Sequence, residues 1–137
     1  MSQSQERQES ERVCASYPLD VSVVELRTKD CDEPRYLFEA PDHVGKRFDD
    51  EESALLYADV YFDVNGFAEA GTGGRGIPPE IVQAGRDTLA AYFVTMPGVD
   101  AQWVASFYGH KPERAERYVS RVRKRASEIR EGIADRR

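Results

Sequence analysis

The spacing of apolar residues changes part-way along the chain, and this change limits the folds that are possible. In residues 19–27 and 36–40 apolar and polar side chains roughly alternate, and Pro34 and Pro41 bound the second segment. Alternation is typical of half-buried strands, so we predict an antiparallel hairpin. From Asp49 onward apolar residues recur at intervals of three and four, as in helices. The sequence therefore predicts an α+β fold that starts with strands and ends with helices.

Capping residues and breakers divide the helical part. The expected helices run from the N-cap Asp49 to Asn65-Gly66, from Pro79 to Met96 before Pro97-Gly98, from Ala101 to Tyr108, and from Pro112 towards Ile133. No strand is expected after the last helix.

Composition suggests four consecutive segments. We predict a disordered tail over residues 1–16, an acidic ββα subdomain over 17–70, a Gly-rich linker over 71–77 and a helical unit over 78–137. Charge follows this division, because residues 1–70 carry a net charge of -10 and residues 71–137 a net charge of +4.

The helical unit contains a short motif. Val104 and Ala105 are an apolar residue followed by a small one, Gly109 comes four residues after Ala105, and Ala115 and Tyr118 follow Gly109 by six and nine residues. At these positions the segment resembles the helix-turn-helix of bacterial and archaeal regulators and of the DNA-reading end of sigma factors. The resemblance implies a trihelical DNA-binding unit whose last helix reads the DNA.

The motif departs from the family at one position. The residue after the turn glycine is normally apolar, and here it is His110.

Basic residues concentrate on the proposed recognition helix, residues 112–125. From Gly109 to Arg125 there are seven basic residues and two acidic ones. Helical geometry turns Arg117, Ser120 and Arg121 outward, where they could meet base edges, and Lys111 and Lys124 suit phosphates. The residues assigned to DNA are Gln102, Lys111, Arg114, Arg117, Ser120, Arg121, Lys124 and Arg125. The alternative is a solvated basic face that pairs with neighbouring carboxylates.

The same helix carries a heptad pattern. Ala115, Val119, Val122, Ala126, Ile129 and Ile133 are spaced by four and three residues in turn. The part beyond the motif either packs on the hairpin and the helix after Asp49 or pairs two copies of the chain. We favour a homodimer with Val122, Ala126, Ile129 and Ile133 as its seam.

The favoured function is sequence-specific binding of double-stranded DNA by a small transcriptional regulator, with the acidic half contacting another protein. The competing hypothesis is a protein-protein interaction module that docks through the heptad helix without nucleic acid.

Enzymatic and cofactor-binding functions have little support in the sequence. His43 and His110 are the only histidines, and neither stands in a recognisable catalytic motif, so no catalytic residue is assigned. Cys14 and Cys31 lack the paired spacing of a zinc site, and no metal or cofactor is expected. The single tryptophan, Trp103, is expected to anchor the core.

Overall composition suggests the kind of organism and the compartment in which the protein works. Of the 19 basic residues 15 are Arg, against 25 carboxylates, a balance similar to that of proteins from extreme halophiles. No apolar segment resembles a signal peptide or a membrane span, so we expect a cytoplasmic protein that does not contact membranes.

Overall fold

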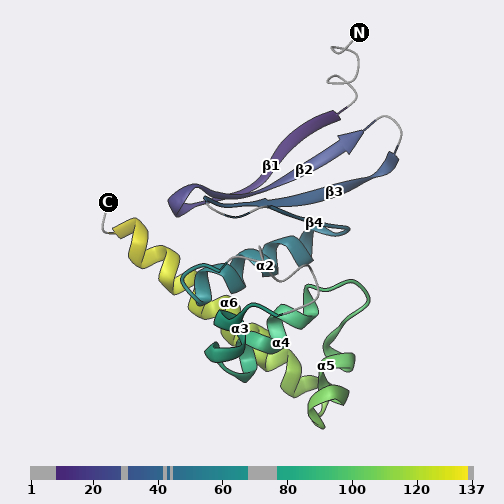
Figure 1. Ribbon diagram of the computed structural model, residues 1–137, viewed down its shortest axis with the longest axis vertical. Coiled ribbons are helices and arrows are strands. Elements are labelled where there is room, and N and C mark those ends of the chain that lie inside the picture. Colours follow the sequence, from purple (N-terminus) through teal and green to yellow (C-terminus); the bar gives the residue numbers. More distant parts are fainter. Residues whose placement is uncertain (1–8, 29–30, 42, 44, 68–76, 136–137) are drawn as a thin grey trace.

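The computed structural model of the chain describes residues 9–28, 31–41, 43, 45–67 and 77–135. An antiparallel sheet covers one side of a group of helices, and the last helix runs from the far end of this group back towards the sheet (Figure 1). The predicted α+β class is therefore confirmed.

The sheet has four strands in sequence order. They are β1 (Glu9–Tyr17), β2 (Val21–Thr28), β3 (Cys31–Glu39) and β4 (Lys46–Phe48), and each pairs antiparallel with the next. A 3-10 turn, η1 (Pro18–Asp20), joins β1 to β2. The predicted hairpin corresponds to β2 and β3, and the sequence analysis missed the two outer strands.

Strand β1 corrects the prediction of a disordered tail over residues 1–16. Residues 9–17 pair along β2 with a register shift between Val13 and Ala15, while residues 1–8 lie outside the described part. β1 shows no apolar periodicity because it is an edge strand whose outer side chains, such as Val13, face solvent. Backbone pairing with β2 stabilises it, and this long-range contribution is invisible in its own composition.

The helices follow the sheet. They are α2 (Glu51–Asp63), α3 (Pro79–Ala84), α4 (Arg86–Val94), α5 (Ala101–Tyr108) and α6 (Pro112–Asp135). The N-cap of α2 is Asp50 rather than Asp49, and its carboxylate accepts a 2.9 Å hydrogen bond from the Ser53 amide. The helix predicted from Pro79 to Met96 is two helices, because the backbone at Gly85 has φ 120°, which ends α3.

One core joins the sheet to the helices. Val23 of β2, Phe38 of β3 and Tyr57 of α2 are fully buried in it. Val122 and Ala126 of α6 belong to the same core. The segments 17–70 and 78–137, predicted as separate substructures, therefore share their packing, while residues 71–76 of the predicted linker lie outside the described part.

No helix in the described part of the chain is both long enough and apolar enough to cross a bilayer.

Candidate functional site

The turn between α5 and α6 is the most sharply defined feature of the helical half. Helix α5 starts at Asp100, whose Oδ1 accepts a 2.9 Å hydrogen bond from the Trp103 amide. It ends at Gly109, whose φ of 73° and ψ of 34° place it in the left-handed region. The His110 amide donates to the Ala105 carbonyl at 2.8 Å, which closes the turn. Three residues then separate α5 from Pro112, the first residue of α6.

A second, smaller core holds α4, α5 and α6 together. Its buried members are Ala90, Phe93, Val104, Ala105, Ala115 and Tyr118. Four of these six are residues that the sequence motif singled out, and they come from both sides of the turn. The turn and its two helices are therefore fixed against α4 by apolar packing.

His110 occupies the position where the sequence motif departs from the family. Its ring forms a triangle with the rings of Tyr108 and Tyr118, with centroid distances of 6.0 and 6.3 Å. Its Nε2 atom is buried and has no hydrogen-bond partner among the described residues. The histidine thus packs among aromatic rings, in surroundings that suit the apolar residue expected there.

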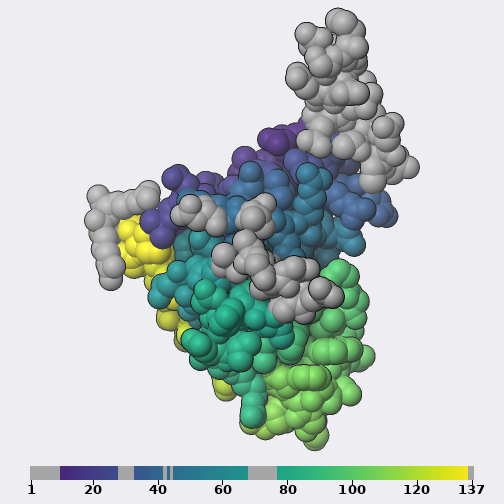
Figure 2. Space-filling model, viewed as in Figure 1, coloured from purple at the N-terminus to yellow at the C-terminus, as the bar shows by residue number. Residues whose placement is uncertain are grey.

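The predicted contact residues lie on the surface of this unit. Gln102, Lys111, Arg114, Arg117, Ser120, Arg121 and Lys124 are all exposed. The turn and the start of α6 border a shallow hollow of about 520 Å³ lined by Gly109, His110, Lys111, Arg114 and Arg117. α5 and the start of α6 form the end of the molecule remote from the sheet (Figures 1 and 2).

Arg125 corrects the set of predicted DNA contacts. Its guanidinium donates from Nε and Nη2 to the two carboxylate oxygens of Asp63 at 2.7 and 2.9 Å. Nη1 donates to Asp87 at 2.7 Å, and Nη2 also reaches the Thr88 hydroxyl at 3.2 Å. These bonds attach α6 to α2 and α4, so Arg125 is engaged within the protein.

The hydrogen bonds between Arg125 and its carboxylate partners shift the pKa values of both Arg125 and Asp87. Hydrogen bonds to Asp63, and next to Asp87, raise the pKa of the Arg125 guanidinium above its usual range. Burial alone would raise the pKa of Asp87, but the hydrogen bond and the positive charge of Arg125 outweigh this effect and lower it. Both groups therefore remain charged at neutral pH.

The residues of the proposed dimer seam pack against the core of their own chain. Val122 and Ala126 have no exposed surface, and Ile129 and Ile133 pack partly buried against the same core. The hypothesis of dimerisation through this seam is therefore wrong for Val122 and Ala126. The heptad spacing arises because α6 lays one apolar side along α2, α4 and α5 of its own chain.

The C-terminal part of α6 is also held by Arg130. Its Nη1 donates to Asp59 of α2 at 2.8 Å, and its guanidinium carbon lies 4.8 and 5.2 Å from the ring centroids of Tyr17 and Phe62. Basic residues of α6 thus divide into an outward set near the turn and an inward set nearer its end.

Trp103 does not anchor the core as expected. Its side chain is 43% exposed and stacks on Phe107, with ring centroids 5.3 Å apart and an interplanar angle of 9°. The i, i+4 spacing of two aromatic residues on a predicted helix was the available signal for this pair.

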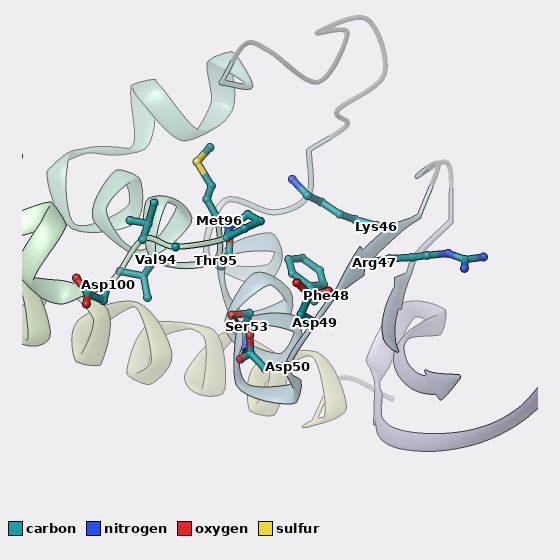
Figure 3. Close-up of a pocket in the computed structure, with 13 residues that line it drawn as sticks. Lys46, Arg47, Phe48, Asp49, Asp50, Ser53, Val94, Thr95, Met96 and Asp100 are labelled. Carbon is teal, nitrogen blue, oxygen red and sulfur yellow. Dashed lines mark hydrogen bonds between the residues drawn. The ribbon is translucent and has the colours of Figure 1, made fainter. Parts of the chain in front are cut away.

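A pocket of about 450 Å³ lies between β4, the start of α2 and the loop from α4 to α5 (Figure 3). The Lys46 ammonium beside it lies 5.3 and 5.7 Å from the ring centroids of Tyr57 and Tyr92, while Arg47 points away from it (Figure 3). Its lining residues are Lys46–Asp50, Ser53 and Val94–Asp100. The lining includes neither histidine nor cysteine, and its Ser53 hydroxyl donates a 2.9 Å hydrogen bond to Asp50 Oδ1 at the start of α2.

The two histidines do not come together. His43 Nε2 lies 3.1 Å from the Tyr57 hydroxyl, and its Nδ1 accepts a 2.9 Å hydrogen bond from the Gly45 amide, so it belongs to the aromatic cluster under the sheet. His110 belongs to the cluster at the α5–α6 turn. Within the described ranges no three His, Cys, Asp or Glu side chains are grouped as a metal site would require.

Comparisons with protein-family models, with curated proteins and with solved structures were made for the whole chain. None of the three found a match. Any function must therefore be argued from the site itself.

Proposed function

We propose that this protein binds double-stranded DNA in a sequence-specific manner and acts as a small transcriptional regulator. Helices α5 and α6 form the helix-turn-helix, with α4 as its supporting helix and the first half of α6 as the recognition helix. The observation that carries the proposal is an exposed basic face directly after a tight, glycine-capped turn between two helices with a common core.

The unpaired positive charge lies on the outward half of α6. Lys111, Arg114, Arg117, Arg121 and Lys124 are exposed, and none forms an ion pair within the described part of the chain. Arg121 lies over the Tyr118 ring at 5.9 Å, and exposed cations that form no ion pair suit the phosphates and the guanine edges of DNA.

The dimensions of this face suit the major groove. Arg114, Arg117, Arg121 and Lys124 follow one another at three- and four-residue intervals, so they share one side of α6. At 1.5 Å per residue they cover about 15 Å of helix length, and a helix about 10–12 Å in diameter fits a major groove about 12 Å wide. We assign Arg117 and Arg121, with Ser120 between them, to base edges, and Lys111 and Lys124 to phosphates.

The competing function, docking of a protein through the heptad seam, has less support. Such docking needs apolar surface on α6, and the buried positions Val122 and Ala126 have none to offer.

The test measures the binding of fluorescently labelled duplex DNA by anisotropy, after a preferred sequence has been selected from random fragments. We expect Arg117→Ala and Arg121→Ala to lose about 1–3 kcal/mol on that sequence and little on unrelated DNA. Lys124→Ala should weaken binding to all sequences alike.

The matched control is Arg123→Ala. It removes the same charge from the same helix, but Arg123 points to another side and lies 3.8 Å from Asp59. Equal affinities of all four variants and the wild type would contradict the assignment of α6 to DNA.

A further inference from the structure

The hollow at the start of α6 is lined by positive charge. Its lining consists of Gly109, His110, Lys111, Arg114 and Arg117, and it encloses about 520 Å³. No carboxylate belongs to this lining, although the whole chain has 25 acidic residues and a net charge of -6. We call this feature the basic hollow.

The three cations of the basic hollow are close neighbours. Arg114 and Arg117 are three residues apart on α6, which places their Cβ atoms about 5–6 Å apart. The Arg114 amide donates a 3.0 Å hydrogen bond to the Lys111 carbonyl, so Lys111 adjoins the same turn. All three side chains are exposed, and among the residues that the structure describes none pairs with a carboxylate. Their mutual repulsion is therefore not relieved by the chain itself.

The backbone beneath the basic hollow is held in place. Gly109 ends α5 in the left-handed region, and the His110 amide is bonded to the Ala105 carbonyl at 2.8 Å. The His110 ring contacts the ring of Tyr118, which is buried in the second core. A ligand would therefore have to order only the long cationic side chains, which keeps the entropic cost of binding low.

We infer that the basic hollow is a binding site for a phosphate group. Three neighbouring cations favour a compact multivalent anion, because every negative charge on it interacts with all three. A phosphate monoester carries about 1.5–2 negative charges at pH 7, whereas a carboxylate carries one. The guanidinium groups of Arg114 and Arg117 are planar forks, which match the paired oxygens of phosphate.

The size of the basic hollow suits a small anion better than an acidic protein surface. Its whole lining comes from the single segment 109–117, whereas a standard protein interface buries about 800 Å² per partner. The phosphate group can come from a free phosphate-bearing molecule or from the backbone of DNA. The second source rests on the proposed function, and the first does not.

The first experiment follows the backbone amide signals of the full chain by NMR. Sodium pyrophosphate is added to about 10 mM at constant ionic strength, a range that detects dissociation constants near 1 mM. We expect saturable shifts that are largest for residues 109–117. Sodium acetate at the same ionic strength should cause much smaller shifts, because its single charge gains less from three cations.

Two variants and a matched control locate the site. Arg114→Gln and Lys111→Gln should each weaken pyrophosphate binding about fivefold, which is the scale of one exposed charge contact. Arg123→Gln removes the same charge from the same helix, but Arg123 is outside the lining and lies 3.8 Å from Asp59. This control should bind pyrophosphate like the wild type. Circular dichroism verifies that all three variants are folded.

The second experiment distinguishes the two sources of phosphate. It measures the salt dependence of duplex DNA binding without pyrophosphate. If the basic hollow takes a backbone phosphate, the log-log slope of Arg114→Gln should be shallower than that of the wild type by about one. Arg123→Gln should keep the slope of the wild type.

Saturable pyrophosphate binding that Arg114→Gln weakens assigns the basic hollow to a free ligand, and a shallower DNA slope assigns it to the DNA backbone. The inference is overturned if Arg114→Gln changes neither measurement, or if acetate reproduces the pyrophosphate shifts. Pyrophosphate binding without any preference among DNA sequences would contradict the proposed function alone.

Discussion

Arg125 was predicted to contact DNA, but in the structure it binds Asp63 and Asp87 within the protein. Its substitution should therefore change stability. The substitution Arg125→Met retains much of the apolar stem and removes the charge. It leaves the Asp63 carboxylate, whose side chain is only 4% exposed, without its two hydrogen bonds from the guanidinium. Breaking a buried pair in this way costs about 3–5 kcal/mol.

The expected cost lies at the lower end of this range. The Arg125 side chain is 40% exposed, so water already screens part of the interaction. We therefore expect the free energy of unfolding to fall by about 3 kcal/mol. With a urea dependence of about 1.5–2 kcal/mol per molar, the unfolding midpoint should fall by about 1.5–2 M.

The assay is urea unfolding followed by circular dichroism, with Arg123→Met as the matched control. Arg123 is exposed and lies 3.8 Å from Asp59, so this variant should lose less than about 1 kcal/mol. A second test uses Asp63→Asn, which should destabilise the wild type but should be neutral or stabilising in the Arg125→Met background. That reversal is expected because the background leaves an unpaired carboxylate to be removed.

Two results would refute this account of Arg125. One is an Arg125→Met variant that loses no more stability than Arg123→Met. The other is a folded Arg125→Met protein whose affinity for duplex DNA falls as far as that of Arg117→Ala, since this would return Arg125 to the DNA interface.

Further predictions concern the turn, a cap, acid and salt. Gly109→Ala should cost about 1–2 kcal/mol by urea unfolding, because φ is positive there while nothing lies within 4 Å of an added Cβ. Asp100→Ala should cost about 1 kcal/mol in the same assay by removing the α5 cap. The pKa of Asp87 in the folded state lies below its usual 3.8. The ionised Asp87 therefore stabilises the fold fully above about pH 3.8, and this contribution is lost as the pH falls through the lowered pKa. Asp87→Asn should therefore reduce the acid sensitivity seen in pH titrations of unfolding. For DNA binding, five cations imply a log-log salt slope of about -4 to -5, and nearby carboxylates that take up cations should make the measured slope shallower.

Local signals in the sequence were sufficient for the helical half. Asp100, Gly109 and Pro112 act on their own neighbours, so the bounds of α5 and the start of α6 were predicted correctly. The buried positions of the motif followed because helical spacing decides which side chains share a face.

Features that depend on distant residues were not predictable in this way. Strand β1 exists because β2 offers it a partner. Trp103 lies at the edge of the second core, where contact with the buried Phe93 of another helix joins its ring to that core. Arg125 resembled its basic neighbours in sequence, and only the fold brings Asp63 and Asp87 to it. Electrostatic roles on a helix thus depend on what the other helices present to it.

Helix α6 is 24 residues long, which corresponds to about 36 Å, and its two halves face different surroundings. Because one continuous helix carries both the outward basic face and part of the main core, the helical unit is not a module that could be transplanted alone. A fragment beginning at Ile77 would lack α2, which packs against α6 in the core that contains Val122 and Ala126. Mutational drift should therefore be unequal along one helix, with the exposed positions near the turn free to vary while the buried positions Val122 and Ala126 stay constrained by packing.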